Sequence, residues 1–259
     1  MEKSRIEWCD SSWNPITGCL HNCSYCYARR IADRFKGCDQ DEVGETSDGT
    51  LFELDKPMRI TNKRGVARNA PYPFGFAPTL HKYRLGDLKR KHFGKTIFVG
   101  STADIFGEWV PDEWIRLVFE ACQKSPEHRY LFLTKNPVRY VKLAEAGLLP
   151  CDDNFWYGST VTTPTQPAFY SDLRHTFVSI EPIAEPFGEY CGEDGIPETA
   201  DWAIFGAETG NRKEKVVPER SWVEGAVKAF HENGKAVFFK NSMIPIWGED
   251  IPQELPWED

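Results

Sequence analysis

Short apolar runs alternate with amphipathic stretches from about residue 96 onward. Each run is too short for a helix and rich in β-branched or aromatic residues, which is typical of a buried strand. The six runs are Thr96–Gly100, Arg129–Leu133, Phe155–Val161, Thr176–Ile180, Trp202–Gly206 and Ala236–Phe239. We expect one further strand near Trp13–Thr17.

Helical periodicity lies between several of these strands. Apolar residues recur at i, i+3, i+4 and i+7 from Ile115 to Cys122 and again from Val223 to Phe230. A first helix is expected from about Ser24 to Lys36. Alternating strands and helices predict βαβ units with a parallel sheet, hence an α/β fold. A partial or complete α/β barrel fits this number of units, and a doubly wound open sheet is the competing arrangement.

Two segments break the alternation. Residues 37–95 are charged, contain four prolines and show no clean period, so we expect an irregular insertion after the first helix. Residues 241–259 contain three prolines and five acids and are expected to form a tail or lid. A length of 259 residues suits a single domain, 1–259.

Composition indicates an ordinary globular protein, with 41% hydrophobic and 27% charged residues. Met1 leads directly into charged residues, unlike a signal peptide, and no apolar run of about 18 residues exists to span a membrane. We therefore expect a cytoplasmic protein without membrane contact. In that compartment, clustered cysteines bind metal or take part in chemistry more often than they form disulfides.

Charge is unevenly distributed around the net value of −8. Residues 39–55 contain seven acids and no base, whereas residues 56–95 contain eleven Lys and Arg and the single acid Asp87. A basic block of this kind favours an anionic partner more than the net charge suggests.

Three of the eight cysteines lie within the segment Gly18–Arg30. Cys19, Cys23 and Cys26 have the spacing C-x3-C-x2-C, with the aromatic Tyr25 before the third. Thiolates are soft ligands that suit iron–sulfur clusters or zinc. A four-iron cluster normally takes four cysteines, so three leave one iron open to a small chelating molecule. The segment follows the first predicted strand, at the face where barrel enzymes carry their active sites.

Three other interpretations of the cysteines stay open. Zinc would require a fourth ligand, for which His21 and Cys9 are candidates. A purely structural cluster is the second, and a coincidental spacing is the third.

The motif resembles that of the radical S-adenosylmethionine (SAM) superfamily. The string NPITGCLHNCSYCYAR resembles the spore photoproduct lyase and DNA-photolyase-like branch. The strings STADIFGE, LFLTKNP, VSIEPI, FGAETG and FFKN are similar to a phage- and prophage-associated radical-SAM-like family of unknown function. The resemblance implies a partial (βα)6-type TIM barrel and a [4Fe-4S] cluster on the three cysteines. It also implies cleavage of SAM to a 5′-deoxyadenosyl radical, with an electron donor such as flavodoxin or ferredoxin.

Polar residues follow the predicted strands, as expected of a pocket at their carboxyl ends. By the resemblance, Ser101, Asp104, Ser159 and Glu181 contact SAM, and Tyr25 approaches the adenine through its backbone. Several of these positions also suit helix N-caps. Lys135, together with Lys240, is a candidate for binding a substrate phosphate or carboxylate, or for pairing with Glu181 or Glu208.

Nucleic acid is the expected substrate class, as DNA, RNA or a nucleotide whose base is modified or repaired. Cations that bind phosphates are interleaved with aromatics that could stack on bases, namely Tyr72, Phe74 and Phe76. The candidate cations are Arg59, Lys63, Arg64, Arg68, Lys89 and Arg90. A solvated basic face, a peptide or small-metabolite substrate, and a non-catalytic iron–sulfur protein are the alternatives.

Overall fold

The computed structural model describes residues 2–39, 50–90, 94–187, 199–210 and 212–258. The chain divides into two compact units, which we describe separately. Unit 1 comprises Met1–Arg5 and Cys9–Tyr130, and unit 2 comprises Ile6–Trp8 and Leu131–Asp259. Much of the acidic block at residues 39–55 lies outside the described residues.

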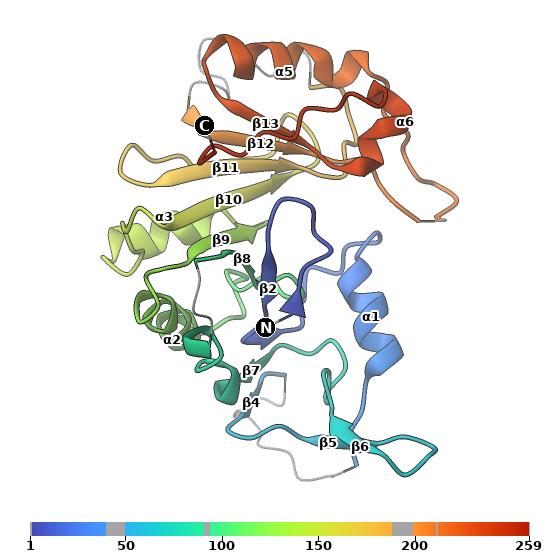
Figure 1. The fold of residues 1–259 in the computed structure, drawn as a ribbon, viewed down its shortest axis with the longest axis vertical. Coiled ribbons are helices and arrows are strands. Elements are labelled where there is room, and N and C mark those ends of the chain that lie inside the picture. The colour runs from blue at the N-terminus through green and yellow to red at the C-terminus, as the bar shows by residue number, and fades with distance from the viewer. Residues whose placement is uncertain (1, 40–49, 91–93, 188–198, 211, 259) are drawn as a thin grey trace. The chain divides into compact units, whose positions relative to one another are not determined.

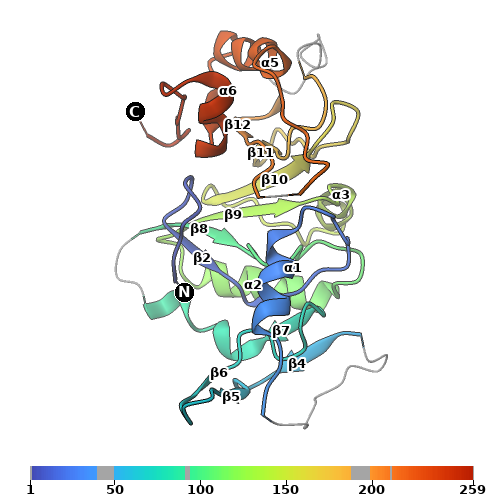
Figure 2. The same cartoon turned by 90° about the vertical axis from the view of Figure 1, so that its right-hand side faces the viewer.

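Unit 1 combines short strands with two α-helices (Figures 1 and 2). β1 pairs antiparallel with β2, and β2 pairs parallel with β8. A small separate sheet has the order β3-β7-β4, and β5 and β6 form a hairpin. The strands are β1 (Glu2–Lys3), β2 (Ser11–Trp13), β3 (Ile16–Thr17), β4 (Phe52–Leu54), β5 (Arg59–Thr61), β6 (Ala67–Asn69), β7 (Thr79–His81) and β8 (Thr96–Val99). The helices are α1 (Tyr27–Phe35), α2 (Asp112–Gln123) and the 3-10 turns η1 (Lys82–Arg84) and η2 (Leu88–Arg90).

Unit 2 contains a parallel sheet. β10, β11, β12 and β13 pair in chain order, with Thr160 opposite Ser179 and Ser179 opposite Ile204. The strands are β9 (Arg129–Thr134, whose first two residues belong to unit 1), β10 (Phe155–Val161), β11 (His175–Ile180), β12 (Trp202–Phe205) and β13 (Ala236–Phe239). The helices are α3 (Val138–Glu145), α5 (Ser221–Glu232), the 3-10 turn η3 (Asn241–Met243) and α6 (Ile244–Trp247).

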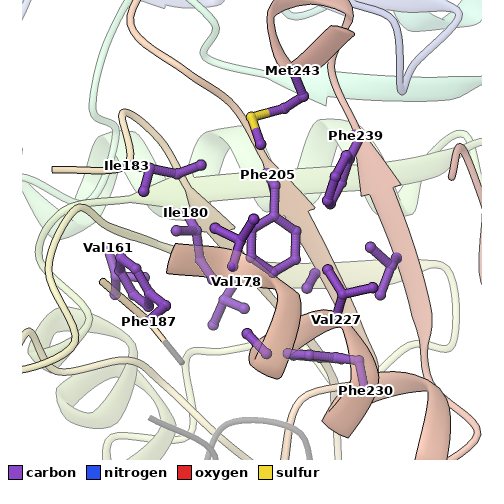
Figure 3. Packing of buried hydrophobic residues seen from close by; sticks show 14 of the residues in the cluster. Val161, Val178, Ile180, Ile183, Phe187, Phe205, Val227, Phe230, Phe239 and Met243 are labelled. Carbon is purple, nitrogen blue, oxygen red and sulfur yellow. The ribbon is translucent and has the colours of Figure 1, made fainter. Parts of the chain in front are cut away.

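The core of unit 2 lies between one face of this sheet and α5 (Figure 3). Alternate strand residues such as Val178 and Phe205 point to this face because side chains along a strand alternate between the two sides. They meet Val227 and Phe230, which lie three residues apart on α5 and are almost fully buried. The apolar periodicity of residues 223–230 is thus confirmed as the buried stripe of a helix.

The expected (βα)6-type TIM barrel is wrong. Backbone hydrogen bonds connect eight strands in the order β1-β2-β8-β9-β10-β11-β12-β13, an open order with two ends. Residues 162–174, between β10 and β11, are all described and contain no helix, so the strand–helix alternation fails there. The doubly wound alternative is also wrong, because the order from β8 to β13 follows the chain and never reverses.

The first predicted strand also differs. Residues 13–17 divide between β2 and β3, which belong to different sheets, and Pro15 lies between them. Proline lacks the N–H that a continuing strand would donate, which accounts for the break. The six downstream apolar runs are strands, as predicted.

The segment 37–95 is not irregular in its described part, because it holds β4 to β7 and two 3-10 turns. These strands have three residues each, too few to show a period in the sequence. The 241–259 tail belongs to unit 2 and packs against its strands. Gln253 forms an isolated antiparallel β-bridge with Phe238, and the ring centroids of Trp257 and Trp202 lie 5.2 Å apart. The predicted role of the tail as a lid is untested.

Candidate functional site

The three cysteines lie on one loop of unit 1, between β3 and α1. Gly18 anchors the start of this loop, since its N–H donates to the carbonyl of Thr102 at 3.0 Å. Gly18 has a φ of 88°, and a Cβ at this position would approach the carbonyl oxygen of Ala77 to 2.3 Å. Only glycine combines this backbone conformation with so close an approach. Gly18 therefore fixes the direction in which the chain enters the cysteine loop.

Cys26 is the N-cap residue of α1. Its N–H donates to the carbonyl of Cys23 at 3.2 Å, and its Sγ accepts a hydrogen bond from the N–H of Arg29 at 3.4 Å. The positive end of a helix dipole stabilises a thiolate at this position. A thiolate at Cys26 would thus receive partial charge compensation from the backbone.

Cys19 is partly buried and faces several negative groups. The pKa of its thiol is raised to about 12, mainly by burial; the N–H of His21 opposes this rise, and the charges of Asp104, Cys23 and Cys26 contribute to it. These groups therefore lie within electrostatic range of Cys19. Ionising these thiols together would require a positively charged partner, such as a metal centre.

His21 connects the cysteine loop to the segment after β8. Its Nε2 lies 2.7 Å from Oδ2 of Asp104, and its ring lies edge-on to Trp109 with centroids 4.9 Å apart. The Asp104 side chain is only 8% exposed, and its Oδ1 accepts the N–H of Phe106 at 3.1 Å. Asp104 thus has both oxygens engaged within the protein. Sequence reasoning considered His21 only as a zinc ligand and missed this contact.

Ser101 and Tyr25 also lie in unit 1. Ser101 Oγ donates to Oδ1 of Asn14 at 3.1 Å, and the same oxygen accepts the N–H of Thr102. Asn14 therefore links β2 to the carboxyl end of β8, a role that the sequence did not reveal. Tyr25 is partly buried between Cys23 and Cys26. Of the predicted SAM contacts, the structure brings Ser101, Asp104 and Tyr25 into the unit that holds the cysteines.

The other predicted contacts belong to unit 2. Ser159 is fully buried, and its Oγ accepts the N–H of Phe169 at 2.8 Å, on the sheet face that packs against α5. Thr160 and Ser179 point to the opposite face. The Ser179 hydroxyl is buried without a hydrogen-bond partner among the described residues. Side chains alternate along β10 and Val161 lies in the core, so Ser159 shares the core face and Thr160 lies on the opposite face.

Two acids at strand ends of unit 2 are paired. Glu181 follows β11 and forms a short ion pair with Lys240, which follows β13. Glu208 pairs instead with Arg212, through two hydrogen bonds of 2.7 Å. Of the two acids expected to pair with Lys240, the structure therefore shows Glu181. Lys135 follows β9 and is partly exposed.

Only some of the residues predicted to bind nucleic acid are exposed. Arg59, Lys63, Arg64 and Arg68 belong to the exposed β5–β6 hairpin, and Lys89 is exposed on η2, whereas the side chain of Arg90 lies outside the described residues. The predicted stacking aromatics are not available. Tyr72 and Phe76 are 7% and 8% exposed beneath α1, and Phe74 stacks on Phe52 at 4.0 Å.

A family model matches residues 3–254 and is described as "Protein of unknown function (DUF5131)". The match covers both units and the whole cysteine loop. The chain belongs to the DUF5131 family. Neither the curated proteins nor the solved structures contain a match to it.

The cysteine loop of this DUF5131 protein carries side chains of the type that bind an iron–sulfur cluster. Cys19, Cys23 and Cys26 are free, partly buried thiols, and Cys19 and Cys26 pack against the apolar residues beneath α1. Within the described ranges, no three His, Cys, Asp or Glu side chains are grouped to hold a metal ion. Zinc would bring its ligands around one ion, whereas each thiolate of a cluster binds a different iron. The donor types are compatible with either group.

The described helices of the DUF5131 protein include none with the length and apolar character needed to cross a membrane.

Proposed function

We propose that this DUF5131 protein is a radical SAM enzyme whose [4Fe-4S] cluster is bound by Cys19, Cys23 and Cys26. The observation that carries the proposal is the cysteine loop itself. Its three thiols share one segment, Cys19 lies in the field of the other two, and Cys26 caps α1. When bound and reduced, such a cluster supplies the electron that cleaves SAM to a 5′-deoxyadenosyl radical.

The protein contributes binding and orientation. Arg29 supports the proposed ligand loop, because its guanidinium donates to the carbonyl of Cys19 at 3.3 Å and lies 4.8 Å from the Phe76 ring centroid. His21 and Asp104 hold the middle of the loop. We further propose that Ser101 and the backbone of Tyr25, both in the unit that holds the cysteines, contact SAM. Those assignments rest on the resemblance to radical SAM enzymes.

A nucleic acid base or nucleotide is the proposed substrate. The support is the exposed hairpin, where Lys63, Arg64 and Arg68 present cations that could contact phosphates. A base within duplex DNA would have to be extruded before reaction. A cytoplasmic location is part of the proposal, since all seven described cysteines are free thiols and that compartment keeps them reduced.

The test is an anaerobic SAM-cleavage assay. The protein is reconstituted with iron and sulfide, reduced with dithionite and supplied with SAM, and 5′-deoxyadenosine is measured. We expect product from the wild type and none from Cys23→Ala. Repeating the assay with DNA, RNA and nucleotides identifies the class that stimulates turnover. Wild-type product no higher than in Cys23→Ala would overturn the proposal and leave a binding protein.

A further inference from the structure

Helix α1 exposes large apolar side chains on one face. Tyr27, Ile31 and Phe35 lie four residues apart, so they follow one another along the helix. They are 50%, 39% and 36% exposed, while Ala28 and Ala32, each one position further along the helix, are buried. A globular helix normally turns polar residues to solvent, and an apolar stripe there marks an interaction surface.

Cations border this stripe. Arg30 and Arg34 lie four residues apart on α1, and both are exposed. The Arg34 guanidinium lies 5.4 Å from the Phe35 ring centroid, and that of Arg68 on the hairpin lies 5.9 Å from it. Among the described residues, no carboxylate pairs with Arg34 or Arg68. We call Tyr27, Ile31, Phe35, Arg30 and Arg34 the α1 surface.

The α1 surface begins at the proposed cluster ligands. Tyr27 follows Cys26 directly, and its hydroxyl donates to the carbonyl of Ser101 at 2.6 Å, which fixes the exposed ring. Leu20, between Cys19 and Cys23, is 48% exposed. The loop that holds the cysteines leads directly into α1 (Figures 1 and 2), so a partner bound to α1 would lie beside it.

We propose that the α1 surface docks an acidic one-electron-transfer protein that reduces the cluster, an inference that rests on the proposed function. The donor loses one electron and the cluster gains it, with no proton or group transferred. Exposed arginines steer an acidic partner, and a small apolar patch suits the transient contacts of redox pairs. Nucleic acid is the rival occupant, because Tyr27 and Phe35 are exposed rings on which a base could stack. The aliphatic Ile31 between these rings favours a protein partner.

The experiment compares two reductants on the reconstituted full-length protein. Formation of 5′-deoxyadenosine is driven either by dithionite, which needs no docking surface, or by enzymatically reduced flavodoxin. Ile31→Glu and Arg34→Glu should each lower the flavodoxin-driven rate about tenfold, the effect of roughly 1.4 kcal/mol of lost binding at subsaturating donor. The dithionite-driven rate should change less than about twofold. Salt should slow the flavodoxin reaction of the wild type more than that of Arg34→Glu, because screening removes the same attraction.

Matched substitutions elsewhere control for added negative charge. Leu173 is 75% exposed, and Lys228 lies on α5 with its side chain 74% exposed. Leu173→Glu and Lys228→Glu should keep both rates. An unchanged flavodoxin-driven rate in Ile31→Glu and Arg34→Glu would overturn the docking proposal. Lost oligonucleotide binding with flavodoxin-driven turnover intact would do the same and assign the α1 surface to nucleic acid.

Failure of this inference is separable from failure of the proposed function. The proposed function fails if dithionite gives no product with the wild type. Docking is measured without SAM, by titrating oxidised flavodoxin into the reconstituted protein, and absence of binding to the wild type overturns it. Should Ile31→Glu lose its iron or its fold, Arg34→Glu replaces an exposed charge only and still decides the question.

Discussion

The Asp104 carboxylate binds the imidazole of His21 at 2.7 Å, joining two loops that are 83 residues apart in the chain. An ionised carboxylate can only accept, so His21 Nε2 donates. Asp104 is held in turn by the N–H of Phe106. A partly buried, charge-assisted hydrogen bond of this kind is stronger than a neutral one and fixes the middle of the C-x3-C segment.

Asp104→Asn should loosen the cysteine loop. The amide is nearly isosteric but loses the charge-assisted bond, which contributes about 1.5 to 3 kcal/mol. We expect the reconstituted variant to release iron to a chelator about tenfold faster than the wild type. The electron paramagnetic resonance spectrum of the reduced cluster should also change, which a loss of stability alone would not cause.

His21→Ala provides the complementary test in a double-mutant cycle. If the two side chains act as a pair, the double variant should release iron no faster than the more affected single variant. Asp172→Asn, at an exposed carboxylate of unit 2, should match the wild type. Additive effects of Asp104→Asn and His21→Ala would show that the contact does not position the loop.

Gly18→Ala should destabilise the protein through backbone conformation and a clash. The new Cβ would meet the Ala77 carbonyl at 2.3 Å, and φ is positive. We expect a loss of about 2 to 4 kcal/mol in the free energy of unfolding, measured by urea denaturation. Gly65→Ala is the matched control, since Gly65 has a φ of 75° but no heavy atom within 4 Å of the added Cβ. Equal losses in both variants would contradict the close approach at Gly18.

The strands downstream of residue 96 could be predicted because their residues are buried on both faces. Trp202, Ala203, Ile204 and Phe205 of β12 are all fully buried, so the sequence shows a continuous apolar run. Whether the strands close into a barrel could not be predicted from the sequence, because apolar runs identify strands but not how the sheet closes. The three-residue strands β4 to β7 carry too little pattern, and only Pro15 indicated where β2 ends.

The candidate site was predictable where its residues are adjacent in sequence. Cys19, Cys23 and Cys26 are found by spacing alone, whereas the pairs His21–Asp104 and Glu181–Lys240 join residues far apart in the chain. The prediction that aromatic residues stack on bases was wrong for a related reason. Tyr72 and Phe76 looked like surface residues beside cations, but they supply the small core beneath α1.

Phe205→Ala tests the core of unit 2. Phe205 is fully buried within the apolar cluster drawn in Figure 3. Removing a buried ring leaves a cavity and typically costs 3 to 5 kcal/mol, so we expect a loss of about that size in urea denaturation. Leu173→Ala, at a side chain 75% exposed, should lose less than about 0.5 kcal/mol. Similar losses would mean that Phe205 does not pack as described.

His81 predicts a loss of stability in mild acid. It is fully buried on β7 of unit 1, where Nε2 meets Thr17 Oγ1 at 2.9 Å and Nδ1 meets Tyr83 Oη at 3.1 Å. Burial, together with a smaller effect of the Arg84 charge, lowers its pKa from 6.5 to about 2. The folded protein therefore keeps this imidazole neutral down to very acidic pH.

The sign follows from proton uptake. Below pH 6.5 the unfolded chain protonates His81 and the folded protein does not, so this residue lowers stability as pH falls. The contribution approaches about 1.4 kcal/mol per pH unit, or roughly 2 kcal/mol between pH 7 and pH 5. His81→Gln cannot be protonated in this range. Its free energy of unfolding, measured in urea at both pH values, should fall less steeply than that of the wild type, although its value at pH 7 is lower. Parallel pH profiles for the two proteins would show that His81 is not the buried neutral group described.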